Sequence, residues 1–261
     1  VGLADVQAAY SGPECDLWEL LMGAQIHVGG LRSSMRLADR AGIPAGSRGV
    51  DLCCCKGAGM QFLVRFRQVA AMTGVDFTPR VIDEGRRRAA AQGTAERVRF
   101  VLAEADRTGL PSAGADFVWG EDAWCYVADK RRLIGEAVRL LRAGGTIAFT
   151  DWLEGTVPLS EAEARRFMAF MKFPSLAAID DYRGLLETNG CRVSCAEDTG
   201  QFASHVDLYV DMLRRQLTYD ALQIVGFDAG MIETIVGELS FVAELARADK
   251  LIQAMFVAVG G

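Results

Sequence analysis

Three acidic residues, Asp51, Asp76 and Asp106, stand at or just after the ends of three successive apolar segments. The first segment leads into a loop of small residues that runs to Gly59. Such a loop lets a ligand approach the backbone at the carboxyl edge of a parallel sheet. Asp76, 17 residues after Gly59, can accept hydrogen bonds from a ribose diol, and Asp106 can accept one from an adenine amino group. Each acid alone is typical of a surface or cap position, but the series predicts a site for a nucleoside-containing cofactor.

A second group of polar and aromatic residues follows the next apolar segment. Glu121 and Asp122 come first, and Trp124 and Tyr126 follow closely. Carboxylates and aromatic rings together can hold a cation, through charge and through the ring quadrupole. We therefore predict a pocket here for a cationic or amine-bearing molecule. The structural alternatives are that Trp124 packs beneath a helical cap and that Asp122 caps the next turn.

The two histidines, His27 and His205, lie in the segments before and after this central region. A lone histidine is more often a hydrogen-bonded structural residue than a catalytic one. Both flanking segments could nevertheless fold over the site. We predict His27 as a catalytic residue, together with Glu121 and Tyr126, and His205 as a substrate-binding residue.

These side chains need a parallel sheet to bring them to one edge, and the middle of the chain alternates apolar segments with helical patterns. Thr78-Pro79 predicts the start of a helix and Gly93 its end, and Asp129 predicts the cap of a later helix that Gly144-Gly145 stop. Five strands are predicted, at Ser47–Leu52, Val69–Asp76, Val98–Ala103, Ala115–Trp119 and Thr146–Asp151. The fold class is α/β, with a doubly wound and mostly parallel sheet.

Helical patterns flank this core on both sides. Residues 160–250 are mostly helical, with a capping box at Ser160 and Glu163 and a persistent apolar stripe after Asp228. Two more strands are predicted at Cys191–Glu197 and Ala254–Val259. We predict one integrated domain, made of an N-terminal helical cap segment (1–42), a cofactor-binding core (43–155), and cap insertions with the last two strands (156–261).

Composition excludes several classes of protein. Hydrophobic residues make up 51% of the chain and charged residues 24%, which excludes disorder, collagen and coiled coil. The net charge is −6 and the basic residues are scattered, which argues against a nucleic-acid partner. No apolar run approaches the roughly 18 residues of a membrane span, and no signal-peptide pattern opens the chain. We expect a soluble, cytoplasmic protein without a membrane partner, and the oligomeric state stays open.

Seven cysteines raise the question of disulfides or a metal site. Cys53, Cys54 and Cys55 are consecutive, and the other four follow no C-x-x-C spacing. Neither histidine lies near a cysteine pair, so zinc is not expected. The cysteines are predicted to be free thiols.

Residues 45–155 resemble the class I S-adenosylmethionine-dependent methyltransferases. The family's first motif, D-L-G-C-G-T-G, corresponds to Asp51 through Gly57, and its D-x-x-x-L-P motif is matched by Asp106 through Pro111. Its R-x-L-[KR]-P-G-G motif is similar to Arg139 through Gly145. The segment from Trp119 to Lys130 resembles W-S-Q-D-A-F-L-H-S-P-D-K of the sarcosine/dimethylglycine N-methyltransferases.

The resemblance implies S-adenosyl-L-methionine as cofactor, a small-molecule acceptor, and a seven-stranded sheet (the Rossmann-like methyltransferase fold) whose last strand is antiparallel. The cofactor-binding residues that it implies are Asp51, Cys53, Cys55, Gly57, Asp76, Phe77, Asp106, Arg107 and Glu121. The acceptor-binding residues are Asp122, Trp124, Tyr126 and His205. The chain departs from the family at Cys53 and Cys55, which replace glycines, at Lys56, which replaces Thr or Ser, and at Tyr126, which replaces a histidine. At positive φ, Cys55 would carry roughly 1 kcal/mol of strain.

Three functions remain as alternatives. Few histidines and no metal cluster favour an amine acceptor, with carbon, oxygen and sulfur acceptors as alternatives, because a neutral amine needs little beyond alignment and exclusion of water. The altered glycine loop leaves room for a protein that binds the cofactor without catalysis. An NAD-dependent oxidoreductase needs G-x-G-x-x-G, which Cys53-x-Cys55-x-x-Ala58 does not supply. The acid at the end of the first strand also suits a sulfonium better than a pyrophosphate.

Overall fold

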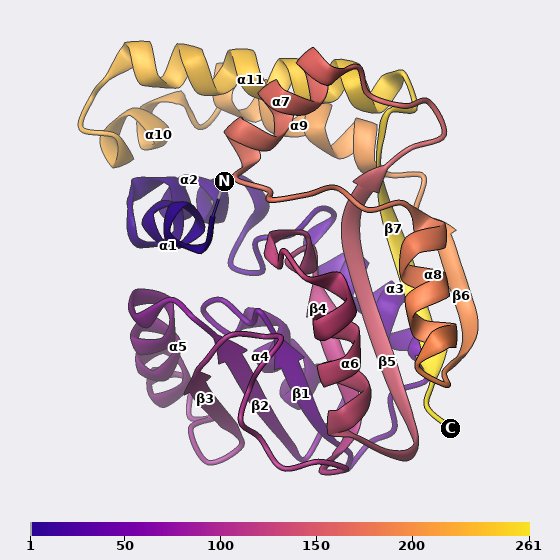
Figure 1. Ribbon diagram of the computed structural model, residues 1–261. Coiled ribbons are helices and arrows are strands. Elements are labelled where there is room, and N and C mark those ends of the chain that lie inside the picture. The colour runs from indigo at the N-terminus through magenta and orange to yellow at the C-terminus, as the bar shows by residue number, and fades with distance from the viewer. Residues whose placement is uncertain (1) are drawn as a thin grey trace.

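The computed structural model describes residues 2–261, and a seven-stranded sheet lies at its centre (Figure 1). The strands are β1 (Arg48–Leu52), β2 (Ala71–Asp76), β3 (Val98–Leu102), β4 (Ala115–Glu121), β5 (Leu141–Glu154), β6 (Arg192–Asp198) and β7 (Leu251–Val259). Their order is β3-β2-β1-β4-β5-β7-β6. Strands β1 to β5 pair in parallel, and β7 is antiparallel to both β5 and β6. The predicted doubly wound sheet with an antiparallel last strand is confirmed.

Helices bury both faces of the sheet. The helices α3 (Gly30–Ala41), α4 (Ala58–Phe66) and α5 (Pro79–Ala91) share one hydrophobic cluster with one face. The helices α6 (Lys130–Leu140) and α8 (Ile179–Thr188) pack on the other face; they lie in front of the sheet in Figure 1. We expected α3 in the cap segment, but Leu37 and Ala38 turn its apolar side onto the sheet.

Local signals set most helix ends. Helix α5 begins at Pro79, directly after Thr78, and Asp129 caps α6 by accepting a hydrogen bond from the backbone NH of Arg132. The predicted stop at Gly144-Gly145 is wrong, because α6 ends at Leu140 and the two glycines lie inside β5. The register between β4 and β5 shifts at its start, and Gly144 has the positive φ of 72° that side chains rarely adopt.

A layer of helices covers the edge of the sheet at which the parallel strands β1 to β5 end (Figure 1). It contains α1 (Leu3–Ser11), α2 (Pro13–Met22), α7 (Glu161–Met171), α9 (Phe202–Arg215), α10 (Thr218–Ile224) and α11 (Ala229–Arg247). As predicted, Ser160 and Glu163 form a capping box at the start of α7. The structure also shows that Asp228 caps α11. None of the helices in residues 2–261 combines the length and apolar character that a membrane crossing needs.

The short 3-10 helix η1 (Trp124–Tyr126) is held in place by a buried acid of β5, Asp151. The backbone NH of Cys125 and the hydroxyl of Tyr182 donate hydrogen bonds to Asp151, at 3.0 and 2.7 Å. Burial raises the pKa of Asp151 to about 6, from an ordinary value of 3.8. The native state therefore binds a proton more tightly than the unfolded chain does.

We expect this acid to make stability depend on pH. Because the pKa of Asp151 is raised on folding, its stabilising contribution to the free energy of unfolding is complete below pH 3.8. That contribution is lost as the pH rises through about 6. The Asp151→Asn variant lacks this ionisation, so its free energy of unfolding relative to wild type should rise by about 2 kcal/mol between about pH 4.5 and about pH 7.5. Urea unfolding across that range measures it, and a difference independent of pH would contradict it.

Candidate active site

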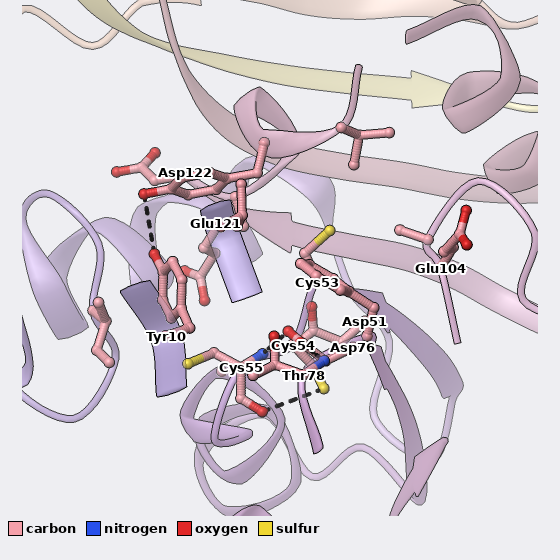
Figure 2. Close-up of a pocket in the computed structure, with 18 of the residues that line it drawn as sticks. Tyr10, Asp51, Cys53, Cys54, Cys55, Asp76, Thr78, Glu104, Glu121 and Asp122 are labelled. Atoms are coloured by element: carbon pink, nitrogen blue, oxygen red, sulfur yellow. Dashed lines mark hydrogen bonds between the residues drawn. The ribbon is translucent and has the colours of Figure 1, made fainter. Parts of the chain in front are cut away.

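A cavity of ≈ 360 Å³ lies at the carboxyl edge of β1, β2 and β4, beneath α1 (Figure 2). This volume falls in the range of small-molecule sites. We call it the edge cavity. Of the predicted site residues, those that line it are Asp51, Cys53, Cys55, Asp76, Phe77, Asp106, Glu121, Asp122 and Tyr126. The structure thus brings nine of the predicted residues to one space, because the strands that carry them end at the same edge.

The loop after β1 alternates between ordinary and left-handed backbone. Cys53, Cys55 and Gly57 have φ values of 64°, 47° and 80°. The two cysteines that replace glycines of the resembling family therefore keep the conformation that glycine would allow. A Cβ at position 57 would lie 2.6 Å from the Phe100 ring, so Gly57 shapes the loop from beneath and does not line the cavity.

We expect glycine to be tolerated at Cys53 and Cys55, which have positive φ, but not at Cys54 between them. Cys55→Gly relieves an unfavourable φ, which offsets the larger entropy of the unfolded chain, so stability should change by less than about 1 kcal/mol and cofactor affinity should stay or improve. Cys54 is buried with an ordinary φ, so Cys54→Gly should cost about 2 kcal/mol. Thermal unfolding and calorimetry with S-adenosylhomocysteine compare the two variants. Equal destabilisation would contradict the prediction.

Asp76 joins the ends of β1 and β2. Its carboxylate accepts hydrogen bonds from the backbone NH groups of Cys55 and Thr78, at 3.0 and 2.9 Å. Burial raises its pKa, and these hydrogen bonds act in the opposite direction. Each carboxylate oxygen keeps a free lone pair for a ligand hydroxyl. Asp106 lies farther along the same wall, 3.5 Å from the guanidinium Nε of Arg132.

Two further carboxyl groups lie close together at the end of β1 and β4. Burial, followed by the nearby charges of Glu121 and Asp76, raises the pKa of Asp51 well above its ordinary value. A Cβ at Gly59 would lie 2.7 Å from Glu121 Oε2, so the absence of a side chain there makes room for Glu121. The cluster holds more negative charge than its buried position favours, and a bound cation would relieve it.

Glu121 also faces the loop between α2 and α3. Its Oε1 lies 3.2 Å from His27 Nε2, with only 7% of the Glu121 side chain exposed. His27 is buried and its Nε2 lies 3.0 Å from Ser34 Oγ. Within residues 2–261 no group makes a well-formed hydrogen bond to Glu121 Oε1. An ammonium or sulfonium ligand fits this arrangement, because it supplies the missing positive charge.

Two tyrosine hydroxyls meet above this cluster. Tyr10 of α1 donates a hydrogen bond of 3.1 Å to Tyr126, and the rings pack edge to face. Burial raises the pKa of both hydroxyls. The sequence analysis did not predict Tyr10 as a site residue, because nothing in α1 indicates a partner 116 residues away.

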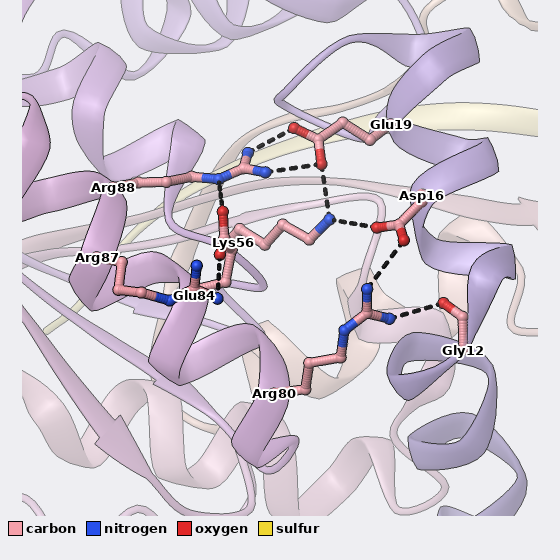
Figure 3. Close-up of polar contacts among 8 residues, drawn as sticks. All are labelled: Gly12, Asp16, Glu19, Lys56, Arg80, Glu84, Arg87 and Arg88. Atoms are coloured by element: carbon pink, nitrogen blue, oxygen red, sulfur yellow. Dashed lines mark hydrogen bonds and ion pairs between the residues drawn. The ribbon is translucent and has the colours of Figure 1, made fainter. Parts of the chain in front are cut away.

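Lys56 was noted in the sequence only as a departure from the family motif. Its ammonium donates to Asp16 and Glu19 of α2, at 3.2 and 2.6 Å (Figure 3). Arg80 and Arg88 of α5 reach the same two acids. Lys56 therefore fastens a cap helix to the loop that follows β1.

Besides Gly57 and His27, three predicted residues lie outside the edge cavity. Trp124 is fully buried beneath it, stacks on Phe149 and donates a hydrogen bond to the carbonyl of Leu52. The side chain of Arg107 is 72% exposed and pairs with Glu104. His205 lies on α9 against the Gln201 carbonyl. In each case the side chain contacts a nearer partner and does not line the edge cavity.

Asp122 lines the cavity, but its carboxylate is already engaged. The backbone NH of Val28 and the side-chain amide of Gln253 donate to it, at 2.8 Å each. All seven cysteines are free thiols, and no metal-binding cluster of His, Cys, Asp or Glu occurs in the described part of the chain.

Comparison with known proteins identifies the chemistry. Residues 50–149 match the model of a methyltransferase domain family. The chain is 28% identical to 27-O-demethylrifamycin SV methyltransferase of Amycolatopsis mediterranei, over 72% of the chain and 74% of that protein. It is 26% identical to sarcosine/dimethylglycine N-methyltransferase of Aphanothece halophytica, over 76% of the chain and 71% of that protein.

Solved structures share the fold. Phosphoethanolamine N-methyltransferase 2 of Haemonchus contortus, in complex with S-adenosyl-L-methionine, has a TM-score of 0.84 at 18% identity, over 97% of this chain and 58% of that one. A mycolic acid cyclopropane synthase in complex with SAH has a TM-score of 0.84 at 18% identity, over 98% of this chain and 97% of that one.

Proposed function

Because this chain is a class I S-adenosylmethionine-dependent methyltransferase that acts on a small molecule, we propose that its acceptor is an amine and its product the N-methylated amine. The observation that supports this is Glu121, a buried carboxylate at the cavity wall without a well-formed hydrogen bond at Oε1 among the described residues. An amine becomes cationic as it gains the methyl group, and a carboxylate placed there favours that charge.

We propose that the lining of the edge cavity holds the cofactor. Asp76 is suited to the ribose and Asp106 to the adenine, with Phe77 and the loop from Cys53 to Cys55 beside them. Asp51 and Glu121 face the charged end. When bound, S-adenosylmethionine supplies an electrophilic methyl group on a sulfonium. The chain's own contribution is to align the acceptor and to exclude water with the cap helices.

The acceptor side has three groups with assigned roles. Glu121 attracts the developing charge, and His27, 3.2 Å away, orients Glu121. The paired hydroxyls of Tyr10 and Tyr126 each keep at least one free lone pair, which can hold an amine N–H toward the methyl group. Asp122 accepts hydrogen bonds from Val28 and Gln253, and so holds the loop that carries His27 against the sheet.

A hydroxyl acceptor is the second candidate, and the His27–Glu121 contact favours it. A hydroxyl loses its proton when it is methylated, and an imidazole next to a carboxylate can accept that proton. The similarity to 27-O-demethylrifamycin SV methyltransferase, whose name places its substrate among O-demethylated molecules, supports this candidate.

A matched amine and alcohol, assayed on wild type and His27→Gln, separates the two candidates. If the acceptor is an amine, wild type should methylate the amine faster, and His27→Gln should keep turnover within about tenfold, since no base is required. His205→Gln, outside the cavity, is the matched control. Faster methylation of the alcohol, abolished in His27→Gln alone, would replace the amine by a hydroxyl. Cofactor binding without turnover of either acceptor would oppose both.

A further inference from the structure

A second cavity, of ≈ 200 Å³, lies between the cap helices α1, α2, α7 and α11. We call it the apolar cavity. Its walls are mostly large apolar side chains, namely Leu17, Trp18, Leu21, Phe170, Met171, Met231 and Ile235. Like the edge cavity, it is partly open to solvent. A concave space with mostly apolar walls and few polar groups is typical of a small-molecule binding site.

The polar residues at its walls are turned to their own helices. The ammonium of Lys172 donates to the carbonyl of Ala169, and the hydroxyl of Thr234 donates to the carbonyl of Gly230. Glu14 is the remaining charged group among the described lining residues. The cavity thus offers mainly aromatic and aliphatic surface, including the edge-to-face pair of Trp18 and Phe170.

The apolar cavity adjoins the edge cavity through the tyrosine pair. Tyr10 and Tyr126 line both cavities, and their hydrogen-bonded hydroxyls lie at the boundary. A small space of ≈ 20 Å³ between them is lined by the same tyrosines, by His27 and Asp122 on one side, and by Trp18 and Met171 on the other. A molecule with its body among Trp18 and Met171 would therefore present its end to His27 and Tyr126.

We propose that the apolar cavity binds the body of the acceptor, and that the acceptor is an amphipathic molecule with an aromatic or branched aliphatic group attached to its nucleophile. This rests on the proposed function, since it names the substrate class of the same site. A small zwitterionic amino acid would leave the apolar cavity unfilled. Burial of apolar area then supplies most of the acceptor's affinity, and the polar end fixes its orientation.

Binding of an uncharged fluorescent probe, phenylnaphthylamine, tests the cavity independently of catalysis. The probe is titrated into protein saturated with S-adenosylhomocysteine, so that it cannot report on the edge cavity. Ile235→Phe and Ala9→Phe fill the space from α11 and from α1. Leu208→Phe, at a position 50% exposed on α9, adds the same ring outside it.

We expect the probe to bind wild type and Leu208→Phe equally, and each filled variant about tenfold more weakly, with unchanged affinity for S-adenosylhomocysteine. Circular dichroism identifies a variant that fails to fold, and the other filled variant then decides. Equal probe affinity in a folded filled variant and in wild type would overturn the proposal.

Turnover separates this inference from the proposed function. In wild type, kcat/KM should rise along methylamine, benzylamine and naphthylmethylamine, and the rise should disappear in the filled variants. If the same rise occurs only with the corresponding alcohols, the amine proposal fails and the apolar cavity keeps its role. If the smallest acceptor is methylated best and the filled variants match wild type, the assignment of the apolar cavity fails.

Discussion

Glu121→Gln should lower kcat about 100-fold while S-adenosylhomocysteine binds almost as tightly as to wild type. The amide keeps the shape of the side chain but removes the charge that lies 3.2 Å from His27 and close to Asp51. That charge matters most when positive charge moves onto the acceptor, so its loss should appear mainly in the transition state.

Comparing the two cofactor forms sharpens this result. S-adenosylmethionine carries a sulfonium and S-adenosylhomocysteine does not, so Glu121→Gln should weaken the first more than the second. Glu96→Gln, an exposed substitution on the same domain, is the matched control for loss of one carboxylate. Steady-state kinetics and calorimetry provide the two measurements. Unchanged kcat in a folded Glu121→Gln enzyme would remove Glu121 from the mechanism.

Asp76→Ala should weaken the binding of both cofactor forms by about 1.5–3 kcal/mol, the cost of losing hydrogen bonds to a charged group. Part of this loss is direct, since a ribose diol would lose its acceptor. Part is indirect, because Asp76 also accepts hydrogen bonds from the backbone of Cys55 and Thr78 and so holds the loop in shape.

The Asp76→Asn variant separates the two parts. An amide oxygen can retain one of the backbone hydrogen bonds, so the loop should be less perturbed while the anionic acceptor is lost. Asp83→Ala, on the exposed side of α5, controls for removing a nearby acid. Calorimetry should show equal losses for S-adenosylmethionine and S-adenosylhomocysteine, since both contain the ribose. Wild-type affinity in folded Asp76→Ala would place the ribose elsewhere.

Local sequence signals predicted the fold well because they act over a few residues. Thr78-Pro79, Asp129 and the Ser160–Glu163 box mark helix starts that the structure contains. The stop at Gly144-Gly145 was misplaced by several residues, because the chain leaves the helix at Leu141, which already pairs with Ala115 of β4. Pairing between strands depends on contacts that no local signal carries.

The sequence by itself determined that acids stand at successive strand ends and that the loop after β1 is shaped for a ligand. Parallel strands share one carboxyl edge, so Asp51, Asp76 and Glu121 had to converge wherever the helices lay. The positive φ of Cys55 was also foreseeable, because the matching motif has glycine there.

Only the tertiary structure decided which side chains complete the site. Trp124 turned into the core against Phe149, and Tyr10 came from α1 to meet Tyr126. His27 reached Glu121, and Lys56 reached the acids of α2, across loops whose direction depends on how the cap packs. The physical reason is that the end of a strand fixes the backbone position of a residue. The direction of its side chain and the position of the cap helices depend on long-range packing, which spacing along the chain does not encode.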